Sequence, residues 1–197
     1  MIFRIYLLIT ALISPLFSFH IAYLNMNNDE LETGIHLDLA QFNHKYDVNR
    51  YFVGVDYLYI EEENNGDYDS FLDLSFLMQS RVQSFRPLTI GIGVKSIYLE
   101  KSENKFMAIP LTLLAKLEFP LLGFKSRLTG SFGYSPKPLT FKSGYRYKES
   151  RVEFGIDIVK RGTVIFGYRN IETKFFENQY LDSRFSESPY IGLKFGW

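Results

Sequence analysis

Strict alternation of apolar and polar residues is the feature of this sequence that most restricts its fold. In the last seven residues one parity is apolar and the other is small or charged: Ile191, Leu193, Phe195 and Trp197 against Gly192, Lys194 and Gly196. Successive side chains of a β-strand point to opposite faces, so this pattern predicts a strand with one apolar face. The pattern recurs over residues 35–40, 51–59, 72–79, 88–95, 107–119, 127–134, 151–158 and 164–169, with a weaker run at 20–26. We therefore predict an all-β chain.

The first eighteen residues have a different character. They begin with one basic residue, Arg4, continue with nine apolar or small residues from 5 to 13, and end after Ser14-Pro15 at the small Ser18. This order is typical of a secretory signal peptide, and its apolar stretch is too short to span a bilayer. We predict a signal peptide over residues 1–18, cleaved after Ser18, followed by one domain over residues 19–197; an uncleaved anchor is the alternative.

Composition excludes several classes of protein. The 22 Lys and Arg residues balance the 22 Asp and Glu residues, so the chain lacks the excess of positive charge that nucleic-acid binding requires. A hydrophobic fraction of 46% argues against disorder. The mean hydropathy of −0.08 argues against a bundle of membrane helices. An exported β-protein remains.

Alternation alone leaves open which face points inward, because a soluble lipocalin-like barrel also alternates. Three features favour a membrane barrel with its apolar face outward. Glycines gather on the polar parity, where small residues relieve crowding in a narrow lumen: Gly54, Gly91, Gly93, Gly133, Gly155, Gly167, Gly192 and Gly196. Aromatic residues lie near the strand ends, as at membrane boundaries: Tyr51, Tyr57, Tyr59, Tyr98, Phe119, Phe124 and Tyr134. The last strand closes on the aromatic Trp197.

The lengths of the connections between the predicted strands agree with a membrane barrel. Counted back from Trp197, they are long at 174–188, tight at 160–162, long at 136–143, short at 120–123, medium at 100–105, short at 84–87 and long at 61–70. Outer-membrane barrels have short periplasmic turns and longer external loops, so we expect every short connection on the periplasmic side. The count predicts a transmembrane antiparallel up-and-down β-barrel of ten strands. Eight is the alternative, if the two N-terminal segments are only partial or plug-like.

Four segments resemble a known family. They are GVKSIYL at 93–99, SPKPLTF at 135–141, FGYRN at 166–170 and SPYIGLKFGW at 188–197. By these segments and the order in which they occur, the chain resembles the YfaZ family of small outer-membrane proteins from Gram-negative bacteria, over roughly residues 20–197. The resemblance implies a porin-like β-barrel in the cell outer membrane and brings no catalytic residues with it.

Charged residues on the polar parity are the candidate functional residues of the lumen. The acidic ones are Asp38, Asp56, Asp73, Glu118, Glu153 and Asp157, and the basic ones are Lys95, Lys116, Arg127, Arg151, Arg169 and Lys194. Equal numbers of opposite charges predict a paired network that fills the barrel, since unpaired charge in a narrow space is costly. A selective channel would carry one dominant sign.

Catalytic and metal sites are weakly indicated. A barrel hydrolase would need His, Ser and a carboxylate together at the rim, for which His36, Asp38 and Ser75 are the candidates. The chain has no GxSxG motif, and we predict a polar lumen histidine and no catalytic residues. The acidic run at 61–69 lacks the spacing of an EF-hand, so it predicts a solvated loop able to bridge lipopolysaccharide through divalent cations. We expect neither a metal nor a cofactor.

The function expected from these patterns is a structural or interaction role at the cell surface. The expected partners are outer-membrane lipids and lipopolysaccharide, and the barrel-assembly machinery, which would read Ile191, Leu193, Phe195 and Trp197 in the C-terminal strand. No nucleic acid is expected as a partner. A narrow pore for small polar solutes is the alternative function, followed by a lipid hydrolase or protease.

Overall fold

A computed structural model describes residues 20–39, 49–61, 68–101, 104–142, 144–175 and 183–196. The predicted signal peptide, most of the acidic run and Trp197 lie outside these ranges. Within them, no helix has both the length and the apolar character needed to cross a membrane.

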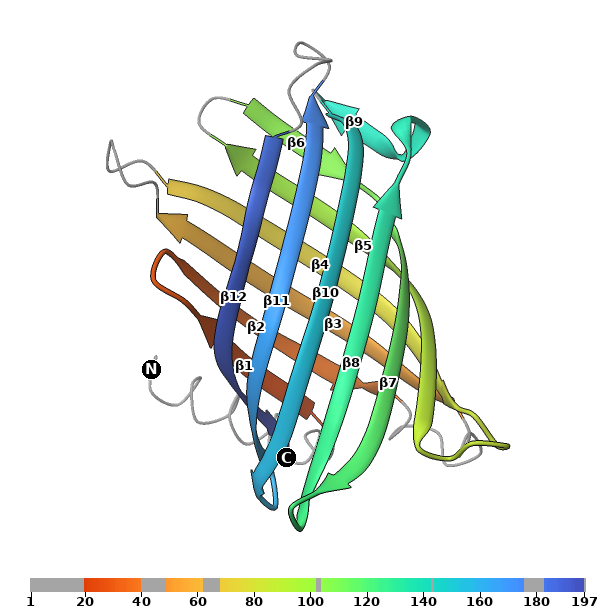
Figure 1. Ribbon diagram of the computed structural model, residues 1–197. Coiled ribbons are helices and arrows are strands. Elements are labelled where there is room, and N and C mark those ends of the chain that lie inside the picture. The colour runs from red at the N-terminus through yellow and green to blue at the C-terminus, as the bar shows by residue number, and fades with distance from the viewer. Residues whose placement is uncertain are drawn as a thin grey trace, which may run out of the picture.

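The described residues form one closed antiparallel β-barrel (Figure 1). Its segments are β1 (His20–Met26), β2 (Glu30–Asp38), β3 (Asn49–Glu61), β4 (Tyr68–Arg81), β5 (Leu88–Lys101), β6 (Asn104–Ala108), β7 (Leu111–Leu121), β8 (Phe124–Ser135), the short 3-10 helix η3 (Lys137–Leu139), β9 (Thr140–Lys142), β10 (Gly144–Val159), β11 (Gly162–Phe175) and β12 (Ser183–Gly196). Segments β6 and β7 follow one another along β5 and count as one wall strand, and β9 extends the edge of β6. The predicted ten-strand barrel is confirmed, with residues 20–26 as its first strand.

The run at 107–119, predicted as one strand, is divided in two. Ile109 and Pro110 separate β6 from β7. Proline has no backbone N–H to donate to the ladder. Around this break the Ile109 N–H donates to the Leu139 carbonyl, and the Lys95 N–H donates to the Pro110 carbonyl. The interruption lets β6 turn onto β9, inside what was predicted to be a long loop.

The first and last strands seal the barrel. Strand β1 pairs with β12 from Ile21 opposite Gly196 to Met26 opposite Ile191, and β12 pairs along its other edge with β11. A register shift in the second pairing makes Phe185 an extra residue of β12, so that Phe185 and Ser186 are both buried. The C-terminal strand is therefore needed for closure.

The two ends of the barrel differ in their connections. The connections at 82–87, 122–123 and 160–161 lie at one end with the end of β12, which we call the short-turn end; the opposite end is the loop end (Figure 1). Leu122 and Gly123 both have positive φ, 51° and 86°, as a two-residue hairpin turn requires.

The N-terminal hairpin does not follow the predicted placement of short connections at one end of the barrel and long connections at the other. The turn between β1 and β2 is only three residues long but lies at the loop end, whereas the end of β2 and the start of β3, which are ten residues apart in the sequence, lie at the short-turn end. Asn27 explains the tight turn, since its side-chain oxygen accepts hydrogen bonds from the N–H groups of Asp29 and Glu30, at 2.9 and 2.8 Å. The prediction that every short connection lies on one side is wrong here.

The outer surface of the barrel is a continuous apolar belt. Every one of the ten wall strands exposes large hydrophobic side chains, among them Leu24, Ile35, Val55, Leu74, Ile92, Leu113, Leu128, Val152, Phe166 and Leu193. A water-soluble barrel would bury such side chains. The alternation therefore has its apolar parity outward, as predicted.

Toward the loop end the polarity of the two faces is exchanged. On β5 the outward Ile92 and Val94 give way to Ser96, while the inward Ile97 and Leu99 are fully buried. On β10 and β11 the outward Lys148 and Glu172 face each other, 3.3 Å apart. The strands thus extend beyond the apolar belt into a section with a polar outside and an apolar inside.

A cluster of buried apolar side chains fills the lumen in this section. It comprises Leu58, Phe71, Ile97, Leu99, Phe106, Ala108, Tyr147, Ile171 and Phe185, and we call it the loop-end plug. The Phe71 ring lies 6.4 Å from that of Tyr147 and 6.1 Å from that of Phe185, measured between ring centroids. Strand β4 and strands β10 and β12 belong to opposite parts of the wall, so these contacts cross the lumen.

Closure predicts a mobility difference on gels. A closed barrel has no free strand edge and unfolds over a high barrier, so we expect the folded protein to resist detergent until it is boiled. Boiled and unboiled samples should migrate differently in denaturing electrophoresis. Equal migration by a sample whose circular dichroism shows intact β-structure would contradict the closed barrel.

Candidate functional site

Below the loop-end plug, the centre of the lumen is crossed by buried ion pairs. Arg169 is 1% exposed and lies between two carboxylates of β2, with Nη2 2.5 Å from Glu30 Oε2 and Nη1 2.7 Å from Glu32 Oε2. Arg151 of β10 also pairs with Glu32, with its two Nη atoms 2.7 and 3.1 Å from the carboxylate oxygens. The guanidinium carbons of both arginines also lie over the ring of Tyr190, at 5.4 and 5.9 Å from its centroid. Glu32 therefore joins three parts of the wall.

A second set of pairs is centred on Lys95 of β5. Its Nζ donates to Asp73 Oδ2 at 2.8 Å and to Glu149 Oε2 at 3.0 Å. Glu149 also accepts a hydrogen bond from the hydroxyl of Tyr147, at 3.1 Å, which connects the charges to the loop-end plug. Because the three charged side chains come from β4, β5 and β10, their interactions tie one side of the barrel to the other.

A third set lies nearer the short-turn end. Glu153 accepts a hydrogen bond from the Tyr190 hydroxyl at 2.8 Å and lies 3.4 Å from the Lys194 ammonium. Arg127 pairs with Asp157, which also accepts a hydrogen bond from the Thr163 hydroxyl at 2.7 Å. Here the groups are only partly buried.

The histidine considered for catalysis has a different partner from the one expected. His36 Nε2 lies 2.7 Å from Asp56 Oδ1, whose other neighbour is the Tyr23 hydroxyl at 2.7 Å. Asp38, expected beside His36, instead pairs with Arg50 at 2.9 Å. The expectation failed because Asp56 comes from β3, and the sequence of β2 alone contains no information on its neighbour.

Ser75 and His36 do come together, on either side of Gly54. A Cβ atom on Gly54 would lie 2.6 Å from Ser75 Oγ and 2.4 Å from His36 Cδ2, so a larger residue there would displace one of these side chains. The imidazole edge that faces this position carries Nε2, which already interacts with Asp56. In a catalytic triad the nitrogen facing the serine must be available to accept its proton. Among the described residues, the His36 nitrogen on the side of Ser75 is instead in contact with Asp56.

All twelve predicted lumen charges lie on inward parity, and each has an oppositely charged or histidine partner. Three carboxylates that are central to the network lie outside the predicted alternating runs: Glu30, Glu32 and Glu149. Each shares the parity of a predicted lumen residue on its own strand, but lies N-terminal to the predicted alternating run, by two residues for Glu149, three for Glu32 and five for Glu30. Their parity is the signal in the sequence that points to the lumen.

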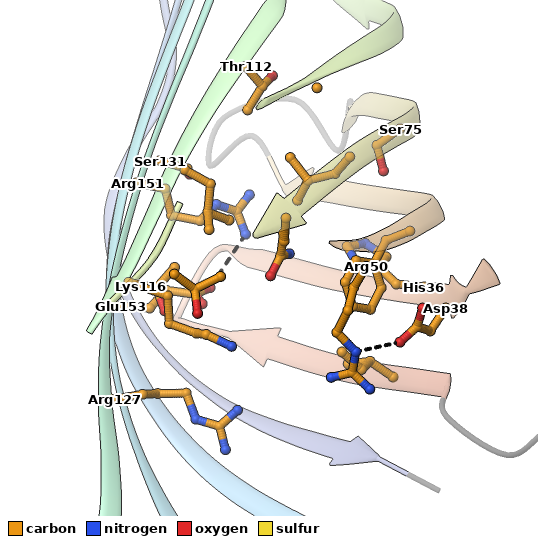
Figure 2. A pocket seen from close by; sticks show the side chains of 18 of the residues that line it. His36, Asp38, Arg50, Ser75, Thr112, Lys116, Arg127, Ser131, Arg151 and Glu153 are labelled. Atoms are coloured by element: carbon orange, nitrogen blue, oxygen red, sulfur yellow. Dashed lines mark ion pairs between the residues drawn. The ribbon is translucent and has the colours of Figure 1, made fainter. Parts of the chain in front are cut away.

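Between the charged centre and the short-turn end the lumen is hollow. The cavity has a volume of about 1440 Å³ and is lined by side chains from both halves of the wall. Figure 2 shows Arg50, His36 and Asp38 on one side of this space and Lys116, Arg127 and Arg151 on the other, with their side chains directed into it. The described residues include no group of three or more His, Asp or Glu side chains placed to hold a metal ion.

The chain matches a known protein family. The family model described as "YfaZ precursor" matches residues 11–197, which include every strand of the barrel. No curated protein matches the chain.

Proposed function

Because the chain belongs to the YfaZ family, we propose that it is an outer-membrane barrel with a structural or interaction role at the cell surface, and that it is closed to solutes. The loop-end plug carries this proposal. Its members Ile97, Leu99 and Phe106 have no exposed surface, and its aromatic rings meet across the lumen. A dry apolar section is a barrier to polar solutes and ions.

The apolar outer surface of the barrel supports the proposed location in the outer membrane. The apolar belt is suited to contact with lipid. At its edge nearer the loop end, four strands carry outward tyrosines: Tyr57, Tyr98, Tyr134 and Tyr168. Tyrosine favours the membrane–water boundary. The exchange of polarity beyond these residues is what a barrel protruding into water requires. Short turns are typical of the periplasmic side, so the loop end faces the outside of the cell.

The same boundary offers contacts for lipopolysaccharide, the proposed lipid partner. Lys142 Nζ lies 4.7 Å from the ring centroid of Tyr98, and Lys137 Nζ lies 5.4 Å from that of Tyr145. Ammonium groups held at the membrane surface attract lipid phosphates. For assembly, the exposed Ile191, Leu193 and Phe195 would be read by the barrel-assembly machinery.

We further propose that the protein is not an enzyme. The only grouping of Ser, His and carboxylate noted in the described lumen has His36 Nε2 engaged by Asp56. A general base oriented in this way has no free nitrogen facing the Ser75 hydroxyl.

Electrical recording tests the closed lumen. We expect the unaltered protein, inserted in a planar lipid bilayer, to give no steady conductance. Replacing both Phe71 and Phe185 by Ala removes two of the rings that cross the lumen, and should produce discrete conductance steps. The matched control is Phe132→Ala, which removes a ring from the outer surface. Steady conductance by the unaltered protein would contradict the proposal and favour the narrow pore.

A further inference from the structure

The cavity at the short-turn end is lined by more positive than negative side chains. Its lining includes eight Arg and Lys residues but five Asp and Glu residues. The ion pairs described above neutralise many of these charges, so the count by itself does not fix the sign of the potential in the cavity.

The exposure of the paired groups indicates that the electrostatic potential in the cavity is positive. In the pair formed by Arg50 and Asp38, the arginine side chain is 54% exposed and the aspartate 2%. Lys116 and Arg127 are 25% and 29% exposed, whereas the lining carboxylate Glu149 is 4% exposed. Most lining carboxylates are therefore buried in the wall, and the positive groups face the water of the cavity. Low-dielectric walls concentrate the resulting field.

Glu118 is the exception among the lining carboxylates, since its side chain is 44% exposed. It lies 3.2 Å from Lys116 and 3.7 Å from Arg81, so two cations share one anion. This grouping still has a surplus of positive charge.

A hydroxyl group at the deep end of the cavity lacks a partner. Thr112 lies on the same face of β7 as Lys116 and lines the cavity, yet it is only 6% exposed. Its Oγ1 atom has no hydrogen-bond partner among the described residues. Buried hydroxyls are rarely left without a partner, so this one is suited to a group that enters the cavity. Figure 2 shows Thr112 on the same side of the cavity as Lys116 and Ser131.

We infer that this cavity binds a small organic anion bearing carboxylate or phosphate groups, which enters from the short-turn end. Arg50, Lys116 and Arg127 would bind the charged groups from opposite walls, and the Thr112 hydroxyl would donate to an oxygen at the deep end. Phe52 and Leu114 offer apolar surface to the carbon skeleton. The inference rests on the proposed closed barrel, because the loop-end plug makes the cavity a dead end that retains a solute instead of passing it on.

Calorimetric titration of the folded, full-length barrel in non-ionic detergent tests the site, with citrate and inorganic phosphate as the probes. We expect citrate to bind, with an affinity that falls as salt is added. Replacing Lys116 and Arg127 together by Gln removes two charged hydrogen-bond donors, and should weaken citrate binding by about tenfold or more. Lys125→Gln removes an exposed charge at the same end of β8, outside the cavity lining, and should leave the affinity unchanged.

Thr112→Val gives a test that does not depend on removing charge. It replaces an unpartnered buried hydroxyl by a methyl group of the same shape, so the melting temperature should stay the same or rise while citrate binding weakens severalfold. Failure of both probes to bind the unaltered protein would overturn the inference, as would an equal loss in Lys125→Gln. Neither result would affect the closed lumen, which the conductance measurement decides separately.

Discussion

Replacing Arg169 by Met is expected to lower the free energy of unfolding by about 3–5 kcal/mol. The substitution leaves Glu30 and Glu32 buried without the cation that lies 2.5 and 2.7 Å from them. Arg151 still faces Glu32, but among the described residues the hydrogen-bond partners left to Glu30 are neutral, such as the Ser188 hydroxyl at 2.5 Å. Urea titration in lipid vesicles, followed by gel mobility of the folded form, measures the effect.

Two variants separate the loss of the charge pair from the loss of side-chain volume. In the triple variant Arg169→Met, Glu30→Gln, Glu32→Gln the unpaired carboxylates are gone, so we expect most of the lost stability to return. Lys194→Met also breaks an ion pair, with Glu153, but at 24% exposure the lysine is better solvated and should cost about 1 kcal/mol or less. If Arg169→Met proved no worse than Lys194→Met, the central role of the buried network would be refuted.

Replacing Leu113 by Arg should destabilise the barrel in a bilayer by about 2–4 kcal/mol. Leu113 is 57% exposed on the outer surface and pairs with Ile92 of β5, well inside the apolar belt. An arginine there must enter hydrocarbon or distort the lipid around it. The measurement is the same urea titration, carried out in vesicles.

The matched control places the same charge on the opposite face. Thr129→Arg adds an arginine to the cavity, where it is hydrated, so it should escape the cost of transfer into lipid. In detergent, which adapts to a polar group more readily than a bilayer, the penalty of Leu113→Arg should shrink. A lumen variant less stable than the surface variant in vesicles would mean that the assignment of inner and outer faces is reversed.

Local patterns in the sequence determined the architecture of this protein. Period-two alternation indicated the strands, the weak run at 20–26 made the even count of ten, and glycines such as Gly54 and Gly167 marked the lumen parity. These properties are local, because the face to which a side chain points depends only on its position along its own strand. For the same reason the sequence of each strand predicts a common face for the twelve lumen charges.

Only the tertiary structure decided which of these side chains meet. The sequence of β2 indicates that His36 and Asp38 share a face. In the barrel, the register with β3 places His36 beside Asp56, and Asp38 pairs with Arg50. The loop-end plug is likewise absent from any single strand, since Phe71 and Tyr147 are 76 positions apart in the sequence and meet only across the closed lumen. Contacts of this kind depend on strand order, stagger and closure, which are properties of the whole barrel. Alternation within one strand fixes the face of a residue, and closure of the barrel fixes its partner.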